Sequence, residues 1–165
     1  MSNLTFEKQG IVIKYTYNGF PVRFKIRNMN YNYVKNLRGN TKNIKYLYYN
    51  LRKSNSVKEY LQYFPEYTDL FKEYQDEIHT VTKELLRQYH NSYVKKSVTK
   101  DTIPFEYKPL CYEVHGNYLK FRKYIGFNEI KNYINNLPAE RLLFVVNYKH
   151  RSVDGVTEQI SNMEV

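Results

Sequence analysis

The amino-acid sequence predicts an α+β fold, in which an N-terminal β-hairpin packs on a mainly α-helical body with one long central helix. Two observations predict this fold. The dipeptide Asn18-Gly19 separates two segments that alternate apolar and polar residues, and residues 66–95 carry apolar side chains at helical spacing. The chain has 165 residues, 42% of them hydrophobic, which suits one compact domain with a sizeable core.

The hairpin is expected from residues 11–17 and 20–27. Asn-Gly favours the two-residue type I′ turn, because both turn positions need positive φ. This turn predicts which residues lie opposite each other, and one face of the hairpin is then apolar. Its pairs are Tyr17 with Phe20, Tyr15 with Val22, Ile13 with Phe24, and Ile11 with Ile26. The other face carries Lys14 opposite Arg23, Lys25 opposite Val12, and Arg27.

Residues 28–40 are rich in Asn and Gly, so we expect a loop. Tyr31 and Tyr33 alternate with Asn, and this pattern leaves a short third strand as the alternative. A basic loop with exposed aromatic rings is typical of proteins that stack unpaired bases.

Several shorter helices are expected along the chain. The first runs from about 41 to 53, with Ile44, Leu47, Tyr48 and Leu51 on one apolar stripe. A capping box from Ser56 to Glu59 opens the next, and Pro65 ends it. Two more helices start at Pro109 and at Asn128, which is a candidate cap. Residues 141–149 favour a helix, although their β-branched run leaves a strand as the alternative.

Residues 66–95 are expected to form one helix about 45 Å long. Its apolar residues are spaced alternately by four and three positions, as in a heptad seam: Tyr67, Phe71, Tyr74, Ile78, Val81 and Leu85. Two interpretations remain open. The seam is either the centre of an α-rich domain or the interface of a homodimeric coiled coil.

The net charge of the chain lies in its first third. Residues 1–53 carry eleven Lys and Arg against one acid, whereas residues 54–165 carry fifteen of each sign. We therefore expect a basic segment at 1–53, a charge-neutral helical body at 54–151, and a polar tail at 152–165 with a composition typical of disorder.

The charge asymmetry predicts a polyanionic partner, and we expect a non-catalytic protein that binds DNA or RNA. The hairpin cations expected to contact phosphates are Lys14, Arg23, Lys25 and Arg27. Those expected to extend the footprint are Lys35, Arg38, Lys42 and Lys45, while Tyr31 or Tyr33 would stack on bases. The alternative is a structural or interaction protein that docks its basic face on an acidic protein surface.

Residue types that carry chemistry are sparse. Cys111 is the single cysteine, which excludes an internal disulfide. Cys111 and His115 would share one face of a helix, but no third residue completes a catalytic arrangement. His and Cys spacings match no metal motif, so we expect neither an enzyme nor a cofactor nor a metal. No secretory leader or membrane-spanning run is evident, so an intracellular location is expected, in cytoplasm, nucleus or virion.

Three segments of the body occur in a recognisable order. They read Tyr63-Phe-Pro-Glu-Tyr67, Tyr112-Glu-Val-His115 with Tyr118-Leu119, and Tyr133-Ile-Asn-Asn-Leu-Pro-Ala139 with Asn147-Tyr148. This order resembles segments of uncharacterised proteins encoded by large DNA viruses with AT-rich genomes, over a little more than half of the chain. The resemblance implies a viral origin, which agrees with a composition of 19 Tyr and no Trp. It implies no activity, partner or site residue.

Overall fold

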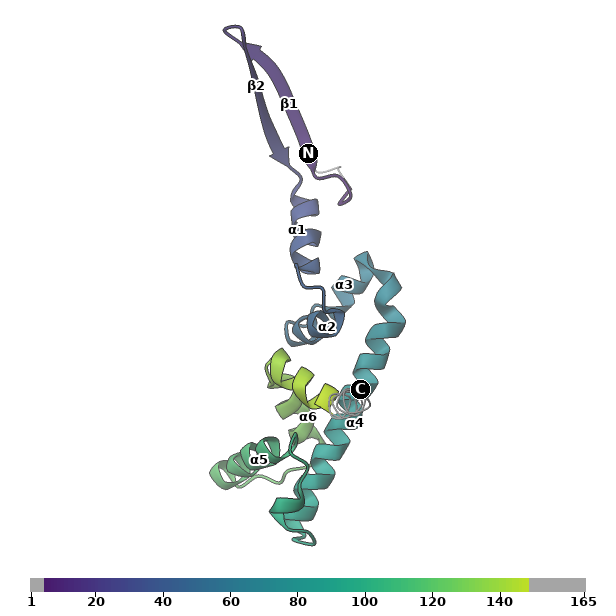
Figure 1. Ribbon diagram of the computed structural model, residues 1–165, viewed down its shortest axis with the longest axis vertical. Coiled ribbons are helices and arrows are strands. Elements are labelled where there is room, and N and C mark those ends of the chain that lie inside the picture. Colours follow the sequence, from purple (N-terminus) through teal and green to yellow (C-terminus); the bar gives the residue numbers. More distant parts are fainter. Residues whose placement is uncertain (1–4, 149–165) are drawn as a thin grey trace, which may run out of the picture.

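The computed structural model describes residues 5–148, and these form an elongated α+β molecule (Figure 1). The strands β1 (Gly10–Tyr17) and β2 (Phe20–Arg27) lie at one end of the long axis. The helix α1 (Met29–Arg38) connects them to a body made of the remaining helices. The predicted fold class is confirmed.

The hairpin has the predicted turn and register. Asn18 and Gly19 both adopt positive φ, 49° and 81°, as a type I′ turn requires. The strands are antiparallel, and Tyr17 lies opposite Phe20, followed toward the base by the other predicted pairs down to Ile11 and Ile26. The separation into an apolar and a basic face therefore holds.

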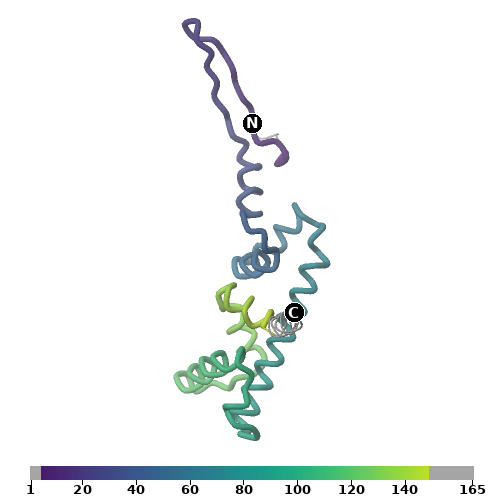
Figure 2. The backbone as a smooth tube through the Cα atoms, in the orientation of Figure 1, coloured from purple at the N-terminus to yellow at the C-terminus, as the bar shows by residue number. Residues whose placement is uncertain are grey.

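The expectation that the hairpin packs on the body is wrong. The tube drawing shows the hairpin projecting beyond the N-terminal end of α1 (Figure 2). The first strand runs outward, and the second returns to the helix. Their apolar side chains stay largely exposed, with 73% of Phe20 and 64% of Tyr17 accessible to solvent. A single residue, Asn28, separates β2 from α1, so the hairpin continues beyond the end of this helix instead of folding back.

Residues 29–38 form α1, so the predicted loop or third strand is wrong. The side chain of Asn28 caps the helix, because its Oδ1 accepts a hydrogen bond of 3.0 Å from the backbone N–H of Asn30. Gly39 ends the helix with φ 65°, and its N–H donates to carbonyls of the last turn. Val34 is buried on the inner side. Both end signals are present in the sequence, but the Asn-rich composition hid them.

The body contains the helices that the sequence predicts, and one short 3-10 turn, at residues 100–102, that it does not. They are α2 (Ile44–Lys53), α3 (Val57–Tyr63), the 3-10 turn η1 (Pro65–Tyr67), α4 (Thr68–Tyr89), the π-helical turn η2 (His90–Val94), the 3-10 turn η3 (Lys100–Thr102), α5 (Lys108–Phe121) and α6 (Phe127–Asn136). Residues 139–148 are also helical, which decides between the two interpretations of that segment. The polar tail at 152–165 lies outside the described residues.

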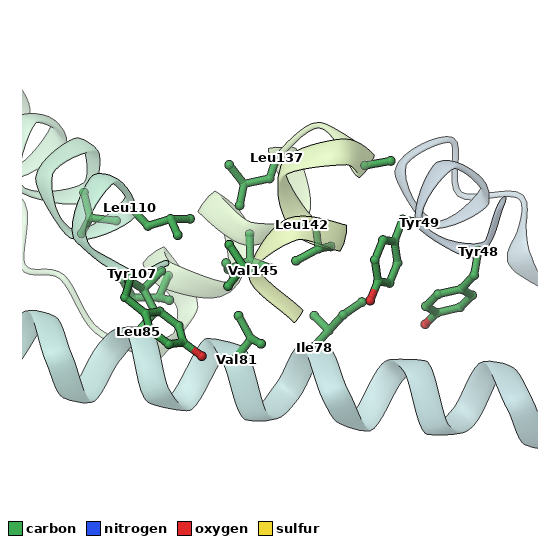
Figure 3. Close-up of a cluster of buried hydrophobic side chains, with 14 of the residues drawn as sticks. Tyr48, Tyr49, Ile78, Val81, Leu85, Tyr107, Leu110, Leu137, Leu142 and Val145 are labelled. Atoms are coloured by element: carbon green, nitrogen blue, oxygen red, sulfur yellow. The ribbon is translucent and has the colours of Figure 1, made fainter. Parts of the chain in front are cut away.

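The long helix is confirmed, since η1, α4 and η2 follow one another from residue 65 to residue 94. Its seam faces other helices of the same chain (Figure 3). Ile78, Val81 and Leu85 point from α4 toward Tyr49 of α2 and toward Leu142 and Val145 near the C-terminal end of the described chain. The seam therefore belongs to the core of this domain, as in the first of the two interpretations.

Two predicted helix caps are wrong in detail. Ser56 makes no side-chain cap, because its hydroxyl donates to the carbonyl of Ser54. Helix α6 begins before Asn128. The carboxylate of Glu129 accepts a hydrogen bond of 2.9 Å from the N–H of Gly126 and caps this helix start instead.

Within residues 5–148, no helix is both long and apolar enough to cross a membrane.

Candidate nucleic-acid interface

The basic face of the hairpin follows from its register. Lys14 lies directly opposite Arg23, and Lys25 lies opposite Val12 on the same face. Arg27 is paired with Gly10 at the base of the hairpin. Side chains directly opposite each other have their Cβ atoms about 5 Å apart, so Lys14 and Arg23 repel each other. All four cationic side chains are exposed. An anion between them would relieve this repulsion.

These four cations have no acidic partner in the part of the chain that the structure describes. Lys25 Nζ donates to Oε1 of Gln9 at 2.9 Å, but this acceptor is a neutral amide. The positive charge of the face is thus open to solvent. We refer to Lys14, Arg23, Lys25 and Arg27 as the basic face.

The opposite side of the hairpin is an exposed apolar surface, which the sequence did not lead us to expect. The rings of Tyr15 and Phe24 pack edge to face with centroids 6.4 Å apart. Tyr17 and Phe20 stand beside the turn at the tip. The apolar face consists of Ile11, Ile13, Tyr15, Tyr17, Phe20, Val22, Phe24 and Ile26. Exposed apolar area of this kind marks contact surfaces in soluble proteins.

The base of the hairpin is held in place by Asn28, which is buried. Its side-chain Nδ2 donates to the carbonyls of Thr5 and Lys8, at 2.8 and 2.9 Å. Its backbone N–H donates to the carbonyl of Gln9 at 3.0 Å. The same side chain caps α1, so Asn28 joins the N-terminal segment, the hairpin and the helix.

Three of the other predicted cations are accessible. Lys35 and Arg38 are exposed on α1, and Lys42 is exposed between α1 and α2. They carry the positive charge from the hairpin toward the body. This placement agrees with the extended footprint that the sequence suggested.

Lys45 does not belong to this footprint, and its assignment is corrected. Its ammonium lies 2.8 Å from the Glu77 carboxylate and 5.1 Å from the ring centroid of Tyr74. It also donates to Oδ1 of Asn147 at 3.3 Å. Only 17% of its side chain is exposed. Lys45 therefore joins α2 to α4 instead of facing a ligand.

The two tyrosines lie on α1 and not on a loop. Tyr33 donates its hydroxyl hydrogen to Glu59 of α3, and this hydrogen bond raises the pKa of the phenol. Tyr31 is half-buried. With its hydroxyl held by α3, Tyr33 is not the mobile loop side chain that base stacking would use, although about half of its area stays exposed.

Cys111 and His115 do not form a catalytic pair. Cys111 is fully buried, and burial raises the pKa of its thiol to about 12. His115 lies among the rings of Tyr89, Tyr93 and Tyr118, with the Tyr93 centroid 4.4 Å away. Burial lowers the pKa of this imidazole, and Lys100 and Arg122 lower it further. A neutral buried thiol is a poor nucleophile.

Within residues 5–148, no group of three or more His, Cys, Asp or Glu side chains is arranged to hold a metal ion. Comparison with known proteins finds no matching family, no similar curated protein and no similar solved structure. The viral origin that the resemblance implies therefore stays a prediction, and any function rests on the geometry of this chain.

Proposed function

We propose that this protein binds nucleic acid through the basic face of its hairpin. The observation that carries the proposal is a projecting two-stranded ribbon with four exposed cations on one side, which no carboxylate of residues 5–148 neutralises. Phosphate contacts dominate the affinity of most nucleic-acid-binding proteins, and they need this kind of unpaired positive charge.

The dimensions of the hairpin suit this ligand. Each strand has 8 residues, which corresponds to about 27 Å of extended chain. The major groove of DNA admits a two-stranded ribbon, and the same length spans several phosphates of a single strand. Lys35, Arg38 and Lys42 would contact phosphates beyond the base of the hairpin.

Gel-shift titrations with single- and double-stranded DNA and RNA test the proposal, at about 50 and about 200 mM salt. If the protein neutralises about four or five phosphates, log K falls against log salt with a slope near −3.5 to −4.5 on duplex DNA. Replacing Lys14, Arg23, Lys25 and Arg27 together by Ala should remove most of this slope and most of the affinity.

A matched control removes equal charge from the body. Lys72, Lys83, Lys95 and Lys123 are all exposed, and the quadruple Ala variant lowers the net charge by the same amount. Full affinity in this control and lost affinity in the hairpin variant support the proposal. Equal losses in both variants, or no binding by the wild-type protein at low salt, contradict it.

The exposed apolar face favours a second candidate function, in which the hairpin docks on an acidic protein. Such a partner would enclose the hairpin, with an apolar strip against this face and carboxylates against the basic residues on the opposite face. Changing Ile13, Tyr15 and Phe24 to Thr keeps the preference for strands and removes the apolar side chains at the centre of the apolar face. If nucleic acid is the partner, this variant retains its affinity for DNA and RNA. Protein docking is supported by a different outcome. The wild-type protein would then bind a peptide of alternating Glu and Leu but no nucleic acid, and both hairpin variants would lose affinity for the peptide.

A further inference from the structure

A cleft of about 680 Å³ opens in the helical body between α2, α4 and α6. Its volume is within the roughly 300–1,000 Å³ of small-ligand sites. The residues that bear on its chemistry are Arg52, Lys58, Asp76, His79, Phe127 and Lys131. None of them belongs to the hairpin or to the footprint described above.

Arg52 is the unusual side chain of this cleft. It is half-buried, and it donates a hydrogen bond to the neutral side-chain amide of Asn135 on α6. Its close neighbours in the core are the phenols of Tyr48 and Tyr49, which are also neutral. Burial lowers the pKa of this guanidinium, but arginine stays protonated in proteins. A positive charge is thus partly withdrawn from water, and no carboxylate of residues 5–148 forms an ion pair with it.

The rest of the chain shows how such cations are otherwise accommodated. Among residues 5–148, three Lys or Arg residues are half-buried and not exposed, namely Lys45, Arg52 and Arg141. Lys45 is paired with Glu77 and Arg141 with Glu113, each at 2.8 Å. Only Arg52 of these three has no carboxylate partner within the described residues. Because an unpaired, partly buried charge is unfavourable, this position calls for an anionic ligand.

The surroundings of Arg52 add further positive charge and ring surface. Lys58 and Lys131 are exposed at the cleft and add two positive charges. Among the residues that line the cleft, Asp76 supplies the one carboxylate. The rings of His79 and Phe127 pack edge to face with centroids 5.5 Å apart. A guanidinium binds two phosphate oxygens at once, and aromatic rings offer contacts for a base.

We propose that the cleft between α2, α4 and α6 binds the phosphate group of a nucleotide, with Arg52 as its main ligand and Lys58 and Lys131 beside it. The nucleotide is either free or part of a polynucleotide strand, since both present the same phosphate and base. This site is separate from the hairpin, and it does not depend on the function proposed for the basic face.

Isothermal titration calorimetry tests the site with three probes: inorganic phosphate, a nucleoside triphosphate and a single-stranded oligonucleotide. Arg52→Gln keeps a hydrogen-bond donor for Asn135 but removes the charge. It should weaken binding at least about tenfold, as expected for one charge-assisted contact. Arg87→Gln is the matched control, because Arg87 is exposed and pairs with Glu84 on the outer surface.

A second variant guards against misfolding of Arg52→Gln. Lys58→Ala combined with Lys131→Ala changes only exposed side chains, and it should also weaken binding while the thermal midpoint stays unchanged. The hairpin quadruple variant should retain Arg52-dependent binding of the nucleoside triphosphate. Arg52-dependent binding of the oligonucleotide alone identifies a polynucleotide strand as the source of the phosphate. The proposal is overturned if the wild-type protein binds no probe, or if Arg52→Gln and the double lysine variant both bind as tightly as wild type.

Discussion

Lys45 of α2 and Glu77 of α4 form an ion pair with 2.8 Å between Nζ and Oε2, and the ring of Tyr74 lies 5.1 Å from the same ammonium. A residue that looks like one more cation of the basic segment is thereby part of the framework of the body. The neighbouring Lys42, three positions earlier, is exposed. The two lysines should therefore respond in opposite ways to substitution.

We expect Lys45→Ala to lower the free energy of unfolding by about 1–3 kcal/mol, because it leaves the partly buried Glu77 carboxylate without its partner. Its affinity for nucleic acid should not change. Lys42→Ala should weaken binding at low salt and leave stability unchanged. Urea unfolding followed by circular dichroism, together with gel shifts, measures both effects. A stable Lys45→Ala protein with lost affinity would return Lys45 to the binding surface.

The base of the hairpin depends on Gly10. This residue has φ 144°, and a Cβ atom there would lie 2.1 Å from the carbonyl oxygen of Ile26. Gly10→Ala should therefore disrupt the hairpin, so its amides exchange with solvent at least about tenfold faster. The amides of α4 should keep their protection, because the hairpin does not pack on the body.

Gly116 provides the control for this substitution. It lies exposed within α5, and a Cβ atom there meets nothing within 4 Å. Gly116→Ala should raise the free energy of unfolding by about 0.5–1 kcal/mol, as expected for an exposed helix interior. Hydrogen exchange resolved by residue separates the two effects. Unchanged hairpin exchange in Gly10→Ala would contradict the geometry at this position.

The thiol of Cys111 should be inert in the folded protein. Burial raises its pKa to about 12, so almost no thiolate exists at pH 8, and the side chain is fully buried. Ellman's reagent should react with it only at the rate of unfolding, and fully in urea. Rapid reaction of the native protein at pH 7 would show that the Cys111 thiol is accessible and reactive, and it would contradict this prediction.

Stability should decline in alkaline solution. Burial raises the pKa of Cys111 from 9.0 to about 12 and that of Tyr60 from 10.0 to about 12. Both groups are neutral when protonated, so the stability that depends on their protonated form is fully present below pH 9. It is lost as the pH rises through about 9 to 12, because the unfolded chain releases these protons first. We expect a loss on the order of a few kcal/mol.

Urea midpoints at pH 8, 10 and 11.5, followed by circular dichroism, measure this decline. Tyr60→Phe should reduce the decline, since the variant keeps the ring and removes the ionisable hydroxyl. Tyr112→Phe is a control at an exposed position, and it should show the wild-type dependence. A stability that is flat between pH 8 and 11.5 would contradict the burial of both groups.

The sequence predicted the elements whose signals are local. The Asn18-Gly19 turn and the alternation around it defined the hairpin register, because a period of two leaves only one register with a uniform apolar face. The heptad spacing from Tyr67 to Leu85 defined the long helix. For α1 the local signals competed: Asn28 and Gly39 mark helix ends, but the Asn-rich segment between them is typical of loops.

The candidate sites show which features follow from neighbouring residues and which depend on the tertiary structure. By itself the sequence determined which residues share a face of the hairpin, so the basic face was predictable from alternation and turn type alone. Only the tertiary structure decided that the opposite face is left exposed, that Lys45 is paired with Glu77, and that Arg52 has no carboxylate partner within residues 5–148. The reason is physical: the period of a strand is a property of neighbouring residues, whereas burial and charge pairing depend on which distant helices approach. Arg52 of α2 and Asn135 of α6 meet because both helices pack against α4 and against each other.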